Sequence, residues 1–89
     1  MDKFDDVFNK RQILATLCGL ITQSSDGSPV EQAPCNMPLG DAILQLAAAD
    51  EVGMDTHEAI VVWQGGILDC HTCLEIADQY GDRLASTSL

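Results

Sequence analysis

The chain has no lysine or arginine between Arg11 and Arg83, a stretch of 71 residues that contains eleven aspartates and glutamates. Elements folded from this stretch cannot form Lys/Arg ion pairs among themselves, so their carboxylates have to be solvated, cap helices or bind a partner. A surface of one charge sign repels nucleic-acid phosphates and anionic lipids and attracts basic molecules. We therefore expect a basic protein partner, no membrane association, and no detectable binding to duplex DNA in a gel-shift titration at physiological salt.

The length of 89 residues predicts one acidic domain, residues 1–89, with a small core. Hydrophobic residues make up 46% of the chain, which is too many for an intrinsically disordered protein despite a net charge of −10. A small core under this self-repulsion favours pairing with a second copy, so we expect a homodimer. The first residues lack the basic and apolar run of a secretory signal, and the expected location is cytoplasmic, with reduced cysteines.

The spacing of apolar residues predicts a mainly α-helical fold, a small bundle of about four helices. The expected helices cover residues 5–22, 39–51, 55–63 and about 68–85, and residues 85–89 are expected to be a frayed tail. The third helix has an alternative. The segment Ala59–Trp63 is rich in β-branched residues and is equally typical of a buried strand.

A long loop is expected between the first two helices, because residues 23–38 contain all three prolines together with several serines and a glycine. Its length exceeds that of an ordinary connection, which suggests a functional or partly extended segment. A short β-hairpin that turns at Ser25–Ser28 is the alternative.

The last predicted helix has the most regular apolar stripe in the chain. The stripe consists of Cys70, Cys73, Leu74, Ala77, Tyr80 and Leu84. We expect this helix to anchor the core, with Leu74, Ala77 and Tyr80 packed against Phe8, Leu14 and Leu17.

The motif Cys70-His71-Thr72-Cys73 has the spacing of a zinc-binding pair. Cys35 and His57 are the candidates to complete a tetrahedral site, with Cys18 as a substitute, and the chain would then be a zinc-stabilised adaptor. Against this hypothesis, both thiols of the motif lie on the apolar stripe, and a second pair with the same spacing is missing. We therefore expect no cofactor, with zinc as the alternative.

The same motif is compatible with thiol redox chemistry. The flanking segments 60–63 and 75–80 are similar to short pieces of the thioredoxin family, although their order and spacing around the motif differ from that family. Burial among apolar side chains raises a thiol pKa, whereas redox thiols need a lowered one. A redox function is therefore not expected.

A helix-turn-helix unit could be formed by residues 45–64, with Gly53 at the turn. Its second helix would present Asp55 and Glu58 to the DNA, where the phosphates require the opposite charge. A helix-turn-helix transcriptional regulator is thus an alternative function that the charge pattern disfavours.

The sequence predicts no enzyme, because neither histidine lies in a nucleophile or metal-protease motif. The main hypothesis is a protein-binding regulator or inhibitor that docks an acidic surface on a basic partner, with nucleic-acid mimicry as its most specific form. The first group of expected contact residues is Asp50, Glu51, Asp55 and Glu58, and the second group is Asp69, Glu75, Asp78 and Asp82.

Overall fold

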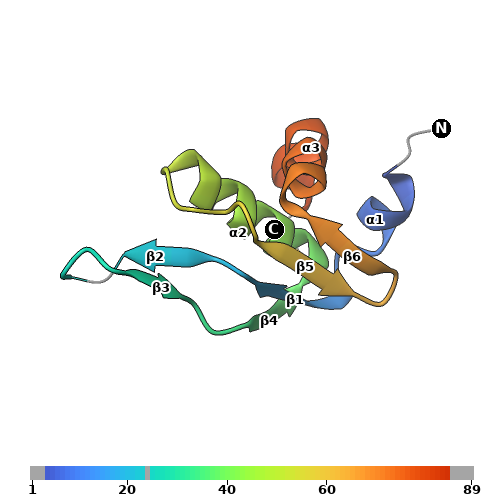
Figure 1. Cartoon of the computed structure of the whole chain (residues 1–89). Helices are drawn as coiled ribbons and strands as arrows, with labels where there is room; N and C mark the ends of the chain where they lie inside the picture. Colours follow the sequence, from blue (N-terminus) through green and yellow to red (C-terminus); the bar gives the residue numbers. More distant parts are fainter. Residues whose placement is uncertain (1–3, 24, 85–89) are drawn as a thin grey trace.

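The computed structural model describes residues 4–23 and 25–84, without the side chains of residues 22, 23 and 82. The described chain contains three α-helices, one short 3-10 helix, a four-stranded antiparallel sheet and a two-stranded ribbon (Figure 1). The predicted all-helical bundle is therefore wrong. The fold combines helices with an antiparallel sheet, and the predicted frayed tail, residues 85–89, lies outside the described residues.

The largest difference from the sequence prediction is a long β-hairpin in place of the first helix and the loop. Helix α1 covers only Asp5–Asn9, and the hairpin then follows as β1 (Leu14–Cys18), β2 (Ile21–Gln23), β3 (Pro29–Glu31) and β4 (Cys35–Pro38). β2 pairs with β3, and β1 pairs with β4 in the same register. The predicted helix over residues 5–22 is wrong, and the alternative hairpin that turns near Ser25–Ser28 is confirmed.

Strand β1 lies in the middle of the sheet, whose order is β4-β1-β5-β6. Its side chains alternate, because Ala15 and Leu17 are buried while Leu14 is exposed. The apolar residues of this segment fit a helical period as well as a period of two. Pairing with a strand on each side decides in favour of the strand, since a central strand satisfies both edges of its backbone.

A second hairpin consists of β5 (Ile60–Trp63) and β6 (Gly66–Asp69). Trp63 pairs with Gly66, which leaves Gln64 and Gly65 as a two-residue turn. The predicted helix over residues 55–63 is wrong, and the alternative strand is confirmed. β5 also pairs with β1, so this hairpin joins the first one in a single sheet.

Two longer helices follow the hairpins. Helix α2 covers Leu39–Glu51, with the bounds that the sequence predicts, and α3 covers Cys70–Tyr80 before the 3-10 helix η1 (Gly81–Leu84). The prediction of one helix over residues 68–85 was therefore right in type but too long. No side chain caps the start of α2. Instead, the N–H of Leu39 donates a hydrogen bond to the carbonyl of Ile13 and the N–H of Gly40 donates one to the carbonyl of Arg11, each with a donor–acceptor distance of 2.7 Å. These two N–H groups at the start of the helix have no acceptor within the helix, so the bonds satisfy them.

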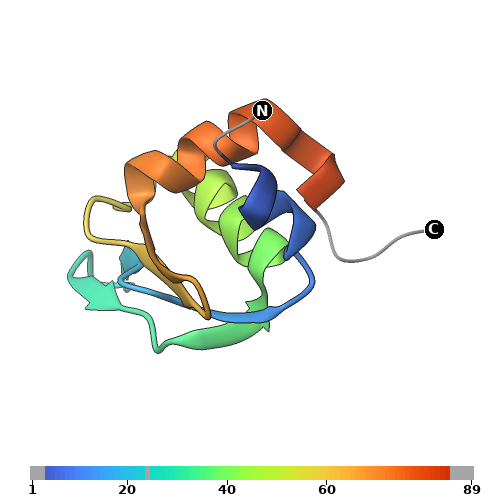
Figure 2. The same ribbon diagram turned by 90° about the vertical axis from the view of Figure 1, so that its right-hand side faces the viewer.

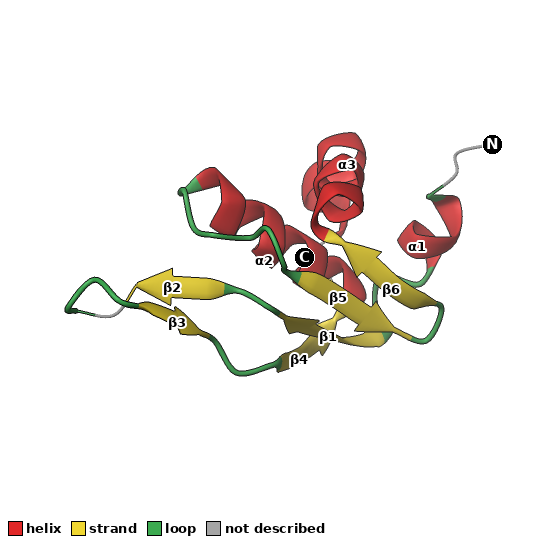
Figure 3. Cartoon of the chain, in the orientation of Figure 1, coloured by secondary structure: helices red, strands yellow, loops and turns green. Residues whose placement is uncertain are grey.

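Helices α2 and α3 pack on one face of the sheet and enclose the core (Figures 2 and 3). The fully buried large side chains of the core are Leu39, Ile43, Leu46, Val61, Cys73, Ile76 and Leu84. The expected contact between Tyr80 and Phe8 is confirmed, since their rings stack with centroids 4.5 Å apart. The expected packing of Leu14 is wrong, because 64% of this residue is exposed. The most buried side chains of α3 are Cys73 and Ile76, whereas Leu74 is half-buried.

Candidate functional site

The first group of predicted contact residues lies at the C-terminal end of α2. Asp50 and Glu51 form the last turn of the helix, and Asp55 and Glu58 belong to the loop that leads to β5. All four residues are exposed. Two of their carboxylates hold the loop. Asp50 Oδ1 accepts a hydrogen bond from Thr56 Oγ1, and Asp55 Oδ1 accepts one from the N–H of His57, each with a donor–acceptor distance of 3.1 Å.

The start of α3 meets this loop. The thiol of Cys70 donates a hydrogen bond to Thr56 Oγ1 over 3.3 Å, which places the first turn of α3 beside the loop. A shallow hollow there is lined by His57, Asp69, Cys70, His71 and Leu74. Asp69 thus joins the first group, and we call the five residues Asp50, Glu51, Asp55, Glu58 and Asp69 the acidic end of the protein.

Asp69 is the N-cap of α3, and its Oδ1 accepts a hydrogen bond from the N–H of Thr72 over 2.8 Å. This backbone hydrogen bond holds the pKa of Asp69 below its ordinary value, with smaller contributions from the Thr72 side chain and from His71. Asp69 therefore carries its negative charge over the whole physiological pH range.

The other members of the second predicted group are not part of the acidic end. Glu75 lies one turn after His71, and their side chains approach to 3.5 Å. Asp78 is exposed on the next turn of α3. Asp82 follows in η1, and its side chain lies outside the described residues. The structure thus distributes these carboxylates along α3 and brings only Asp69 to the first group.

The described cations gather at the opposite end of α2. Arg11 and Arg83 lie over the stacked rings of Phe8 and Tyr80, with the Arg11 guanidinium carbon 4.4 Å from the centroid of Phe8. Lys10 pairs with Asp6 over 3.5 Å. Because Gly40 bonds to Arg11 at the start of α2, the length of the helix separates the two ends by about 20 Å. The described lysine and arginine side chains therefore lie at the end of α2 that is far from the acidic end.

The position of Asp50 and Glu51 is unfavourable for the free protein. The C-terminal end of a helix has a partial negative charge, and a carboxylate there costs about 0.3–1 kcal/mol at an exposed site. The last turn of α2 contains no basic residue to offset this cost. Within the described parts of the chain, none of the five residues of the acidic end forms an ion pair with lysine or arginine. Hydrogen bonding within the fold explains the placement of Asp50, Asp55 and Asp69, but not that of Glu51 and Glu58.

The predicted zinc ligands are not brought together. Cys70 bonds to Thr56, Cys73 is buried and directed to the carbonyl of Leu68, and Cys35 lies exposed on the edge strand β4. His57 is the only one of the other predicted ligands that shares the hollow with Cys70. The described residues contain no group of three or more His, Cys, Asp or Glu side chains that could hold a metal ion.

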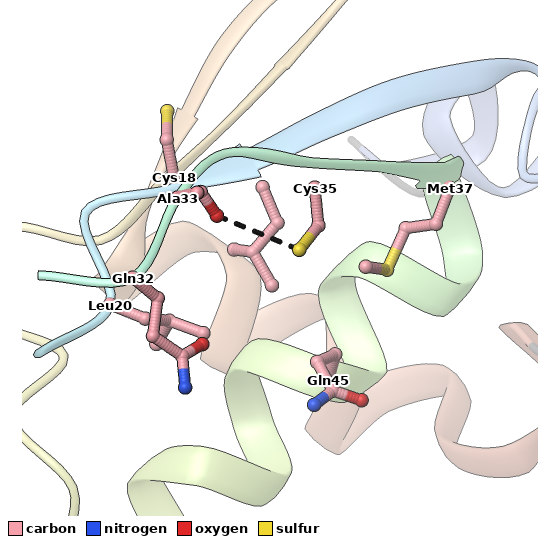
Figure 4. A pocket seen from close by; sticks show the side chains of 8 residues that line it. Cys18, Leu20, Gln32, Ala33, Cys35, Met37 and Gln45 are labelled. Carbon is pink, nitrogen blue, oxygen red and sulfur yellow. Dashed lines mark hydrogen bonds between the residues drawn. The ribbon is translucent and has the colours of Figure 1, made fainter. Parts of the chain in front are cut away.

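Cys18 and Cys35 both border a small cavity between α2 and the strands β1 and β4. The sulfur of Cys35 points toward the carbonyl of Ala33, 3.6 Å away, whereas the sulfur of Cys18 points away from it (Figure 4). Cys18 therefore does not join Cys35 as a ligand or as a disulfide partner in this arrangement.

Burial raises the pKa of the Cys73 thiol to about 12, with smaller contributions from Cys70 and Asp69. A thiol with this pKa is protonated at neutral pH and is a poor nucleophile. The sequence predicted that burial would raise the thiol pKa in the Cys70-His71-Thr72-Cys73 motif. This holds for Cys73, the more buried of the two thiols.

The second helix of the predicted helix-turn-helix unit does not form. Residues 52–59 are a loop, and the residues that would continue the second helix form strand β5. A helix that could enter the major groove is therefore absent from residues 52–63, all of which the structure describes.

Sequence reasoning missed the hollow at the acidic end, because Asp69 joins Asp55 only through the second hairpin. The sequence signal for this hairpin was the turn at Gln64–Gly65 between two apolar segments that contain β-branched residues.

Comparison with protein-family models, curated proteins and solved structures finds no match. None of the described helices has the length and apolar character needed to cross a membrane.

Proposed function

We propose that this protein is a non-enzymatic regulator or inhibitor that docks its acidic end on a basic surface of another protein. The observation that carries the proposal is the gathering of five exposed carboxylates from α2, the following loop and the start of α3 at one end of the molecule. Two of them, Asp50 and Glu51, lie where the dipole of α2 disfavours a negative charge, and the described lysine and arginine side chains lie at the other end of that helix. A basic partner would relieve this unfavourable electrostatic energy on binding.

The hollow beside Asp69 gives the acidic end a shape that suits a long cationic side chain. Its lining combines the carboxylate of Asp69 and the apolar side chain of Leu74 with His57, Cys70 and His71. Arginine and lysine both place an apolar stem below a charged head, so the stem can pack on Leu74 while the head meets the carboxylate of Asp69. A surface that normally binds nucleic acid has such side chains in number, and nucleic-acid mimicry is the specific form of this proposal.

A capture experiment with matched variants tests the proposal. We expect the wild-type protein to retain a basic protein from extracts of its native host and the double variant Glu51→Lys/Glu58→Lys to retain at least tenfold less, because charged interfaces steer association. These two positions are chosen because their side chains make none of the hydrogen bonds that hold the loop. Glu51→Lys also places a positive charge at the C-terminal end of α2, where the helix dipole favours it, so thermal stability is expected to stay equal or rise slightly.

The control for total charge is Glu31→Lys/Asp78→Lys, which reverses two exposed carboxylates outside the acidic end. It should retain the partner nearly as well as the wild type. Equal loss in both double variants would show that net charge, not the acidic end, attracts the partner. Release of the partner by added duplex DNA would support nucleic-acid mimicry, and retention despite excess DNA would contradict that specific form.

A further inference from the structure

One face of the four-stranded sheet has no described element over it. Helices α2 and α3 both lie on the opposite face (Figure 3). Among the described residues, the large hydrophobic side chains with substantial exposure are few, and three of them lie on the uncovered face. Leu14 is 64% exposed, Val62 39% and Ile67 65%.

These side chains form a continuous surface. Cross-strand pairing aligns Thr16 with Val62 and Val62 with Ile67, in one row across β1, β5 and β6. A second row aligns Cys18 with Ile60 and Ile60 with Asp69. We call Leu14, Thr16, Cys18, Ile60, Val62 and Ile67 the open face. Its six residues carry no charge, and Asp69 lies only at its margin, so this face differs sharply from the acidic end.

The charge pattern indicates what covers the open face. The whole chain has a net charge of −10, so two copies repel each other wherever their carboxylates approach. The open face is an uncharged surface on which a second copy meets no like charge, except at Asp69 on the margin. A two-fold dimer also needs a surface that complements itself, and an apolar face meets this condition whereas the acidic end does not.

The area of the face determines how tight such a contact can be. Strands about 4.8 Å apart and about four residues long give the four-stranded sheet a footprint of roughly 19 by 13 Å. Even with the relief of the side chains, this is less than the roughly 800 Å² that each partner buries in a standard interface. The contact therefore suits a dimer that dissociates readily.

We propose that the open face packs against the open face of a second copy and forms a reversible homodimer. The two sheets then lie about 10 Å apart, as in other face-to-face sheet packings, with Val62 on the inner strand β5 near the centre of the contact and Ile67 on the edge strand β6. Asp50, Glu51, Asp55 and Glu58 lie outside this contact, at the end of α2 and in the loop after it, and Asp69 lies at its margin, so the dimer presents two acidic ends to basic partners.

Sedimentation velocity of the full chain under reducing conditions tests the dimer. We expect monomer at about 10 µM and mostly dimer near 1 mM, which corresponds to a dissociation constant of about 0.1 mM. Raising the salt from about 0.05 to 0.5 M should strengthen the dimer, because screening weakens the repulsion between two acidic copies. A wild-type protein that stays monomeric at 1 mM, or a dimer that weakens with salt, would overturn the proposal.

Two valines provide matched variants. Val62→Glu adds a charge to the open face and should weaken the dimer at least tenfold, whereas Val52→Glu adds the same charge at a residue that is 75% exposed after α2 and should leave the dimer nearly unchanged. Equal weakening by both variants would contradict the assignment of the interface. Circular dichroism checks the fold, and if Val62→Glu does not fold, Ile67→Thr keeps a β-branched side chain on the edge strand β6 and should still weaken the dimer several-fold.

The dimer and the proposed function can fail separately. Val62→Glu should leave capture of a basic partner measurable at one acidic end, while Glu51→Lys/Glu58→Lys should leave the dimer intact or tighten it. The two associations also respond to salt in opposite directions, since like charges repel in one and unlike charges attract in the other.

Discussion

Replacing Ile76 with alanine is expected to destabilise the protein by about 2–5 kcal/mol. Ile76 is fully buried in the core that α3 shares with α2 and the sheet, and alanine leaves a cavity that a small core cannot close. For a domain of this size the melting temperature should fall by roughly 10 °C or more. Thermal unfolding followed by circular dichroism measures the effect.

Leu74→Ala is the control for this prediction. The sequence pattern placed Leu74 at the centre of the buried stripe, but the structure shows it half-buried beside the hollow at the acidic end. Its replacement should therefore cost clearly less than that of Ile76, because less apolar area is lost from the interior. A larger loss for Leu74 than for Ile76 would show that α3 presents a different face to the core.

Replacing Gly40 with alanine should destabilise the protein by about 1–3 kcal/mol, although alanine is the better helix former. Gly40 is the second residue of α2, and a Cβ atom there would collide with the backbone carbonyl of Leu84 and lie 3.0 Å from Cβ of Arg11. A backbone carbonyl cannot move aside as a side chain can. The start of α2, the segment at Arg11 and the end of η1 would have to separate.

The matched control lies in the same helix. Ala48 is exposed on α2, so Ala48→Gly should cost about 0.5–1 kcal/mol through helix propensity alone. Glycine is thus preferred at position 40 and alanine at position 48, and chemical denaturation of both variants measures this inversion. A Gly40→Ala protein that is more stable than the wild type would contradict the close contact between α2 and η1.

The sequence predicted those parts of the fold in which one local pattern dominates. Helix α2 has an apolar face and a glycine soon after its end, and both of its bounds were predicted. Helix α3 was predicted from its apolar stripe. The helix begins at Cys70 because the side chain of Asp69 caps its first turn.

The hairpins could not be decided from local patterns. Residues 14–18 fit a helix and a strand equally well, and only the pairing with β4 and β5 makes them a central strand. Residues 29–38 read as a loop because of their prolines, but Pro29 and Pro38 lie at the ends of β3 and β4, where a missing N–H is tolerated. The error in Leu14 follows from the same cause, since a strand directs it away from the core.

The acidic end was partly predictable. Asp50, Glu51, Asp55 and Glu58 are close in sequence, so their proximity needs only the turn after α2. The β5–β6 hairpin brings Asp69 to them, whereas about two turns of α3 separate Asp78 from them. The positions of the charged residues in the sequence show neither the hairpin nor this separation.

The attraction between the acidic end and a basic partner is tested most directly by measuring the association rate constant with the captured partner as a function of salt. We expect the rate constant for the wild type to fall at least tenfold between about 0.05 and 0.5 M salt, because screening removes electrostatic steering. The rate constant of the Glu51→Lys/Glu58→Lys variant should start lower and change less. A wild-type rate constant that does not depend on salt would contradict the claim.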